Sequence, residues 1–294
     1  MLRRGGPVYT RRIAETEIGI VHLARLLGIL GLFTVAAGAQ APAAPPPAGA
    51  VPGGAAAQAP AGTASPRKVK PPPRRYPPLL PPLPASAPQV GTYNYKARLK
   101  NNSGESDVRM TTSIQDAPDA WKIVDTVVTA AVNTTFTTIL DRRTLTVRHN
   151  SMRSSGTAVE MEFKDGKVEG QYSSRTGDHP IHGETPPLLA GSAGNGQMVA
   201  CLPLAEGYRV SYASFDTINQ RSMLMQLQVQ GSEQVTVPAG TFDAYKVEIS
   251  SIPARQVTTL WVDKATRIPV KAVTEVTVAG SDRAGMTLNS ELIP

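Results

Sequence analysis

The sequence predicts an all-β protein built on one antiparallel sheet of about ten to twelve strands, with one short helix. Three observations support this fold class. Apolar and polar residues alternate with a period of two in many short segments after residue 91. Turn-forming residues separate these segments. Each segment has one apolar and one polar face, which is typical of an antiparallel sheet with a single buried side.

The alternation identifies the individual strands. Successive side chains of a strand point to opposite faces of the sheet, so a two-residue period places all apolar side chains on one face. The clearest cases are residues 93–100, 159–164, 208–212, 223–230 and 245–250.

Three turns fit between the predicted strands. Asp165-Gly166 is a hairpin signal, and residues 263–266 separate two further strands. In Pro238-Ala239-Gly240, proline fixes φ for a type I turn, and glycine suits the left-handed position that begins a bulge. We expect a three-residue corner between strands near 221–237 and 241–251, with an architectural rather than a working role.

One region lacks a regular period. Residues 173–196 alternate poorly, which predicts a long irregular loop. Residues 197–202 then form the expected short helix, which Pro203 stops.

Residues 1–39 have the features of an export signal. Five arginines precede a stretch of about fourteen apolar residues, Leu26–Ala39, and Ala37-Gly38-Ala39 is an A-x-A cleavage site before Gln40. The apolar stretch is shorter than the roughly twenty residues that span a bilayer. We therefore expect a periplasmic or otherwise exported protein that does not span a membrane once the signal is cleaved.

Residues 40–90 form a predicted disordered linker. Sixteen of these 51 residues are proline and about half of the others are alanine or glycine, so the segment cannot bury enough apolar surface to fold. The basic stretch Arg67–Arg75 is a candidate contact with an anionic envelope surface; the alternative is a solvated linker that its charge keeps soluble. Residues 91–294 are the predicted folded β domain.

The charge distribution argues against nucleic-acid binding. The positive net charge of the chain, +7, comes from residues 1–90, which carry ten basic and two acidic residues, a net of +8. The predicted domain keeps 20 basic and 21 acidic residues. A nucleic-acid-binding protein needs a basic face on the domain itself.

Side chains suited to catalysis are sparse, so we expect no enzyme, no cofactor and no metal site. The lone cysteine, Cys201, lies in an apolar segment and reads as a small packing residue. Asp178, His179 and His182 are the best metal candidates, but Pro180 prevents the helix that would aim both imidazoles at one ion. Other carboxylates, namely Asp116, Asp125 and Asp263, are expected at strand ends and turns.

The apolar face of the sheet is the remaining candidate site. Six large side chains are expected to share it, either as ordinary core or as the wall of a site for a lipid or acyl chain, because methionine adapts to varied shapes. They are Trp121, Phe136, Met161, Met223, Met225 and Trp261.

Several blocks resemble domain of unknown function 3108, a family of exported proteins of Gram-negative bacteria. They are Gly170, Leu202-Pro203-Leu204 with Glu206-Gly207-Tyr208, Val237–Phe242, Trp261-Val262-Asp263 and Ile268–Lys271. The resemblance covers roughly residues 91–294. It implies a strongly curved antiparallel sheet or open half-barrel, similar to the carriers that move lipoproteins between membranes, and it implies no catalytic residues.

Three functions remain open from the sequence. The first is an exported, non-enzymatic envelope protein that binds an apolar ligand, such as a lipid or a lipoprotein acyl chain, on the inner face of the sheet. The second is a structural or protein-interaction module of the envelope with a sealed core. The third is a metal-dependent hydrolase that uses Asp178, His179 and His182 in the loop at residues 173–196.

Overall fold

The computed structural model describes six segments of the chain: residues 80–102, 104–189, 195–216, 221–252, 256–276 and 285–294. The predicted signal and residues 40–79 of the predicted linker lie outside them. Within the described segments, the only helix is six residues long, and none is long and apolar enough to cross a membrane.

The described residues form fourteen strands and one short helix, which confirms the all-β class and raises the predicted strand number. The first eight strands are β1 (Gly91–Asn101), β2 (Gly104–Ala117), β3 (Ala120–Val128), β4 (Asn133–Asp141), β5 (Val147–Ser154), β6 (Thr157–Lys164), β7 (Lys167–Ser174) and β8 (Gly177–Glu184). After them come α2 (Asn195–Ala200), β9 (Arg209–Asp216), β10 (Arg221–Val237), β11 (Gly240–Ile252), β12 (Gln256–Asp263), β13 (Pro269–Val276) and β14 (Met286–Ile293).

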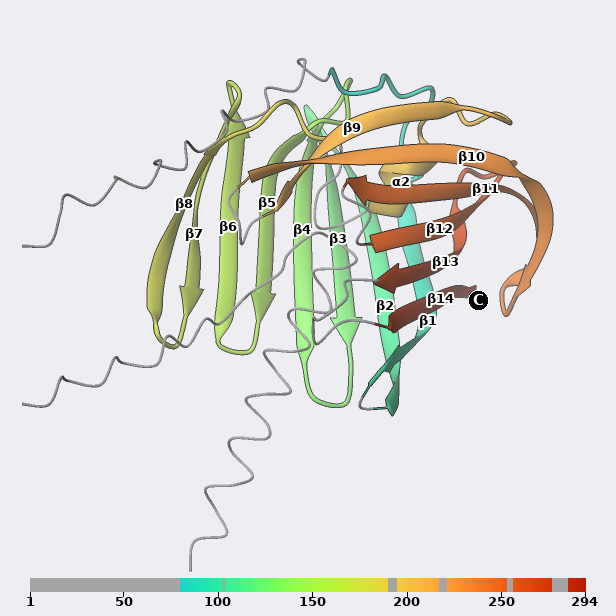
Figure 1. Cartoon of the computed structure of the whole chain (residues 1–294), viewed down its shortest axis with the longest axis horizontal. Helices are drawn as coiled ribbons and strands as arrows, with labels where there is room; N and C mark the ends of the chain where they lie inside the picture. Colours follow the sequence, from blue (N-terminus) through green and yellow to red (C-terminus); the bar gives the residue numbers. More distant parts are fainter. Residues whose placement is uncertain (1–79, 103, 190–194, 217–220, 253–255, 277–284) are drawn as a thin grey trace, which may run out of the picture. The chain divides into compact units, whose positions relative to one another are not determined.

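All fourteen strands belong to one antiparallel sheet in the order β8-β7-β6-β5-β4-β3-β2-β1-β14-β13-β12-β11-β10-β9. Two up-and-down meanders, β1–β8 and β9–β14, are therefore joined by the ladder between β1 and β14, where Ala97 lies opposite Ser290. In Figure 1 the strands of the second meander cross the direction of β3–β8. Helix α2 packs against β13.

The sheet is not closed, since β8 and β9 remain its two edges. The edges approach each other without a ladder. One isolated parallel bridge joins Leu188 to Ala213, and the Ser222 hydroxyl donates a hydrogen bond to the Glu184 carbonyl at 3.2 Å. This arrangement agrees with the open half-barrel that the family resemblance implies.

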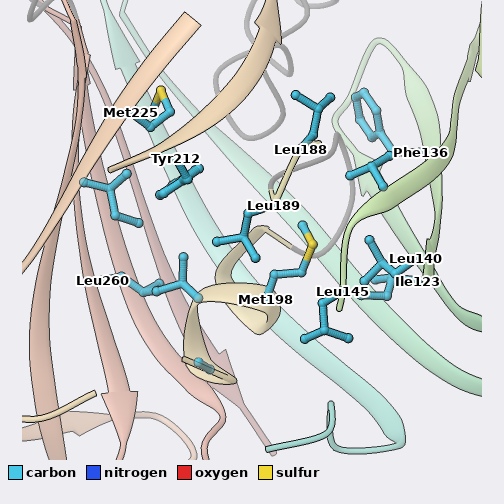
Figure 2. Packing of buried hydrophobic residues seen from close by; sticks show 14 of the residues in the cluster. Ile123, Phe136, Leu140, Leu145, Leu188, Leu189, Met198, Tyr212, Met225 and Leu260 are labelled. Carbon is cyan, nitrogen blue, oxygen red and sulfur yellow. The ribbon is translucent and has the colours of Figure 1, made fainter. Parts of the chain in front are cut away.

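The segment between β8 and β9 supplies the centre of the core. Leu188, Leu189, Met198 and Leu202 are each no more than 1% exposed and belong to one cluster with the inner faces of the strands. In Figure 2, Met198 and Leu189 lie between Leu260 and Tyr212 on one side and Leu140 and Ile123 on the other. Burial between two parts of one sheet explains why this six-residue helix is stable.

Two local predictions need correction. Residues 177–184 are not part of an irregular loop but form the edge strand β8, paired with β7 from Ser174–Gly177 to Lys167–Glu184. Pro180 hides this strand from sequence analysis, yet an edge strand tolerates proline because one of its sides needs no hydrogen-bond donors.

The second correction concerns the Pro238-Ala239-Gly240 corner, whose loop has two residues rather than three. Gly240 already pairs with Val237 as the first residue of β11, and its φ is +139°, positive but outside the left-handed helical region. The corner also packs onto the rest of the sheet, because the Ala239 amide donates a hydrogen bond to the Leu292 carbonyl at 3.1 Å.

Candidate ligand-binding cavity

A cavity of about 110 Å³ lies between α2 and the inner face of the sheet. Its walls come from β1–β3, from β9–β14 and from one side of α2. Pockets for drug-sized ligands range from about 300 to 1,000 Å³, whereas an engineered cavity of about 150 Å³ holds benzene. The space therefore fits a small molecule or the end of a longer one.

Helix α2 forms one wall of the cavity and is held tightly against the sheet. The Gln197 side chain donates to the Tyr95 hydroxyl at 3.5 Å, and this hydroxyl donates in turn to the Pro269 carbonyl at 3.0 Å. Gly196 permits the close approach, since a Cβ there would lie 3.2 Å from Cγ of Pro269 and 3.5 Å from Cδ1 of Leu260. Two hydrogen bonds through the Tyr95 hydroxyl, and the absence of a side chain at Gly196, thus hold α2 in place as this wall.

The apolar part of the wall combines side chains from both halves of the sheet. Met110 on β2 contributes from the first half, and Tyr212, Met225, Ile249 and Leu260 contribute from the second. Each is less than 10% exposed. Two flexible thioethers in one small wall allow it to adapt to ligands of different shape.

A carboxylate faces this cavity from the middle of β3. Asp125 is half-buried and accepts a hydrogen bond of 2.5 Å from the Thr112 hydroxyl, which is 4% exposed. The expectation that Asp125 sits at a strand end or turn is therefore wrong. It alternates with the buried Ile123 and Val127, so its position in the period already placed it on the inner face.

The hydroxyl of Tyr95, which lines the cavity, has a raised pKa. Burial, and secondly the negative charge of Asp125, raise the pKa of the Tyr95 phenol well above its ordinary value. The hydroxyl is consequently neutral at physiological pH, and its proton points to the Pro269 carbonyl.

The six predicted inner-face residues separate into two groups. Trp121, Phe136, Met161 and Met225 are buried members of the main core, and of these only Met225 lines the cavity. Met223 is half-buried and lies outside that core cluster.

Trp261 does not join the main core either. It packs on a second, smaller cluster of Val237, Ala244 and Val270, while its neighbours in sequence, Leu260 and Val262, belong to the main core. Its indole donates to a Glu233 carboxylate oxygen at 2.6 Å.

The candidate metal ligands are not brought to one point. Asp178, His179 and His182 are exposed on the edge strand β8, where residues 179 and 182, three apart, face opposite sides of the sheet. The His179 ring instead stacks on Tyr172 with 5.8 Å between ring centroids. Across the described residues, no group of three or more His, Cys, Asp or Glu side chains is placed to hold a metal ion.

Cys201 behaves as the packing residue that the sequence predicts. It is 2% exposed, and burial raises the pKa of its thiol to about 11. Its backbone carbonyl just after α2 accepts hydrogen bonds from the amides of Ala85 at 2.7 Å and Ser86 at 3.2 Å. The last residues of the predicted linker therefore satisfy a carbonyl at the end of the cavity helix.

The described residues therefore form an all-β protein in which an open antiparallel sheet wraps around a short helix beside a small, partly open cavity. The chain belongs to the family described as protein of unknown function DUF3108, whose sequence profile matches residues 92–288. Comparison with curated proteins gives no match.

Solved structures offer distant likenesses. A β-barrel-like protein of domain of unknown function DUF1849 from Brucella abortus shares 11% identity over 71% of this chain and 98% of its own, with a TM-score of 0.46. The hypothetical lipoprotein YmcC from Escherichia coli shares 14% identity over 70% of this chain and 88% of its own, with a TM-score of 0.30. TM-scores below 0.5 leave these likenesses too weak to support an argument about function.

Proposed function

We propose that this protein is an exported, non-enzymatic envelope protein that binds a small apolar or amphipathic ligand in the cavity between α2 and the sheet. The cavity itself is the observation that supports the proposal: about 110 Å³ lined by Met110, Met225, Ile249 and Leu260 beside a few polar groups. A concave apolar site with few convergent polar groups is the usual form of a small-molecule site. A whole acyl chain exceeds this space, so only its end enters unless α2 moves.

The direct test uses 1-butanol as the probe and the methionine methyl groups as reporters in NMR spectra. We expect the methyl signals of Met110 and Met225 to move in a saturable way. Met152 and Met161, which are fully buried outside the cavity lining, should not move. Signals of Met110 and Met225 that stay fixed at saturating butanol would overturn the proposal.

A cavity-filling variant sharpens this test. Ala272 lines the cavity, so Ala272→Leu places three additional carbon atoms in it and should abolish the shifts. Ala158→Leu on β6, outside the cavity lining, is the matched control and should leave them unchanged. Denaturation curves of both variants establish that they are folded.

A second candidate function is a protein-interaction module with a sealed core. The observation that favours it is the filling of the inner face by Leu188, Leu189, Met198 and Leu202. Deletion of residues 40–79 tests it, since this deletion spares the Ala85 and Ser86 contacts. An interaction module should then lose its envelope localisation while its denaturation midpoint stays unchanged and butanol causes no shift.

Export is the part of the proposal that rests on residues 1–39. We expect cleavage before Gln40. Intact-mass measurement of the protein from a periplasmic fraction tests this, and a mature protein that still begins near Met1 would indicate an uncleaved anchor.

A further inference from the structure

We infer that the cavity prefers a short ligand with a cationic head, such as a primary alkylamine, and disfavours carboxylates and phosphates. This inference rests on the proposed ligand binding and specifies the chemistry of the ligand. Its structural basis is the inward-facing carboxylate of Asp125 next to an apolar wall.

Asp125 is fixed in a position to meet a ligand. The Thr112 hydroxyl donates to Oδ1 at 2.5 Å and sets the orientation of the carboxylate. An ionised carboxylate has about four lone-pair sites on two oxygens, so it accepts several donors at once. An ammonium group offers three donors and a compensating charge, which makes the hydrogen bond charge-assisted on both sides.

The described lining offers no cation ready to receive an anion. Lys271 is the only basic residue among the lining residues, and its ammonium lies 2.9 Å from a Glu291 carboxylate oxygen. A ligand carboxylate or phosphate would therefore enter beside Asp125 without compensation. Like charges in a partly desolvated site repel more strongly than in water.

Several hydroxyl groups of the wall are already engaged in hydrogen bonds. The Tyr95 hydroxyl donates its proton to the Pro269 carbonyl, and the hydroxyls of Thr258 and Thr274 lie 3.0 Å apart in a mutual hydrogen bond. The Thr112 proton is directed at Asp125. The protons of the Tyr95 and Thr112 hydroxyls are therefore not available to an anionic ligand, which again favours a donating ligand.

The apolar end of the ligand fits on the other side of the same space. Met110, Met225, Ile249 and Leu260 line it with thioether and alkyl groups. A volume of about 110 Å³ lies below the roughly 150 Å³ that accommodates benzene, so an alkyl chain of about four carbons is the appropriate length.

The experiment compares three probes of equal chain length at pH 7: n-butylamine, 1-butanol and n-butyrate. Their dissociation constants are measured from the methyl shifts of Met110 and Met225 in the full chain. We expect n-butylamine to bind at least about tenfold more tightly than n-butyrate. The amine gains a charge-assisted hydrogen bond to Asp125, whereas the acid is repelled by the same carboxylate. The dissociation constant of 1-butanol should lie between those of the amine and the acid.

Asp125→Asn isolates the charge, because asparagine keeps the size of the side chain and an oxygen that accepts from Thr112. We expect this variant to lose at least about tenfold of the preference for amine over acid while still binding butanol. Asp107→Asn is the matched control: its carboxylate is 73% exposed on β2, and its loss should leave the preference unchanged.

The outcomes separate this inference from the proposed function. Butyrate that binds as tightly as butylamine, or an unchanged preference in Asp125→Asn, overturns the cationic selectivity while ligand binding stands. Methyl signals that respond to none of the three probes overturn ligand binding itself. The comparison of amine with acid in the unaltered protein remains decisive even if Asp125→Asn fails to fold.

Discussion

Replacing Gly170 by alanine should destabilise the domain strongly, because the β6–β7 pair leaves no room for a side chain there. Gly170 lies opposite Met161 of β6 and Ile181 of β8. A Cβ at this position would lie 2.9 Å from the Met161 Cα, and closer still to the Glu160 carbonyl oxygen. Real Cβ atoms essentially never approach backbone atoms within 3.0 Å, so one strand must shift.

The magnitude follows from the atoms that obstruct the new methyl group. These atoms are backbone, so no rotamer change relieves the contact. Overpacking typically costs about 1–3 kcal/mol, and a strained ladder hydrogen bond adds about 0.5–1.5 kcal/mol. The reduced freedom of the unfolded chain returns about 0.4–1 kcal/mol. We therefore expect Gly170→Ala to lower the free energy of unfolding by about 2 kcal/mol, within a range of about 0.5–4 kcal/mol.

Urea denaturation followed by circular dichroism measures this change. Gly231 provides the contrast, since a Cβ there meets nothing within 4 Å and only its φ of +155° is unfavourable for alanine. Gly231→Ala should therefore cost about 1 kcal/mol. A Gly170→Ala protein within about 0.5 kcal/mol of the original would refute the close-approach argument, because surface-like substitutions fall in that range.

Three further predictions concern a corner, a carboxylate and a thiol. Gly240→Ala should cost on the order of 1 kcal/mol, because φ is +139°, without changing butanol affinity; stable protein with lost affinity would make the corner functional. Burial of Asp141 opposes its ionisation, but hydrogen bonds from the Thr144 amide and the Arg148 guanidinium outweigh burial and hold its pKa below the ordinary value. The contribution of ionised Asp141 to the free energy of unfolding is thus complete above about pH 4 and lost as the pH falls. The urea midpoints of Asp141→Asn and of the original protein should therefore converge in acid, and a difference that does not depend on pH contradicts this. The Cys201 thiol should resist a disulfide reagent at pH 8 until guanidinium unfolds the chain, since it is buried with a pKa of about 11; native reaction at the rate of free cysteine would show exposure.

Much of the local structure follows from the sequence because it depends on neighbouring residues. Asp165-Gly166 predicts a tight hairpin, and both residues have positive φ, 52° and 76°, between β6 and β7. Likewise, Gln197 begins a predicted helix that the structure confirms at Asn195–Ala200. The alternation of apolar and polar residues and the turn-forming residues are sufficient to predict such local features.

The missed features depend on distant residues. Strand β8 contains Pro180 and little alternation, and its strand conformation comes from pairing with β7. Asp125 is a polar residue at an inner-face position, and its residue type predicts a turn. The hydrogen bond that accommodates it there comes from Thr112, thirteen residues away in the sequence. The cavity itself exists because α2 packs against β13, and no local pattern encodes that contact.

The β1–β14 ladder has a consequence for the order of folding. Each meander is built from sequential hairpins, which form through short loops, but the two meanders unite only when Met286–Ile293 pairs with Gly91–Asn101. Tyr95 is 102 residues from Gln197 and 174 residues from Pro269, so the two hydrogen bonds that hold α2 in place also span most of the domain. Until this pairing, the inner face of the first meander lacks the strands of the second that share its core in the folded domain. The carboxyl-terminal strand is thus the one that joins the two meanders into a single sheet.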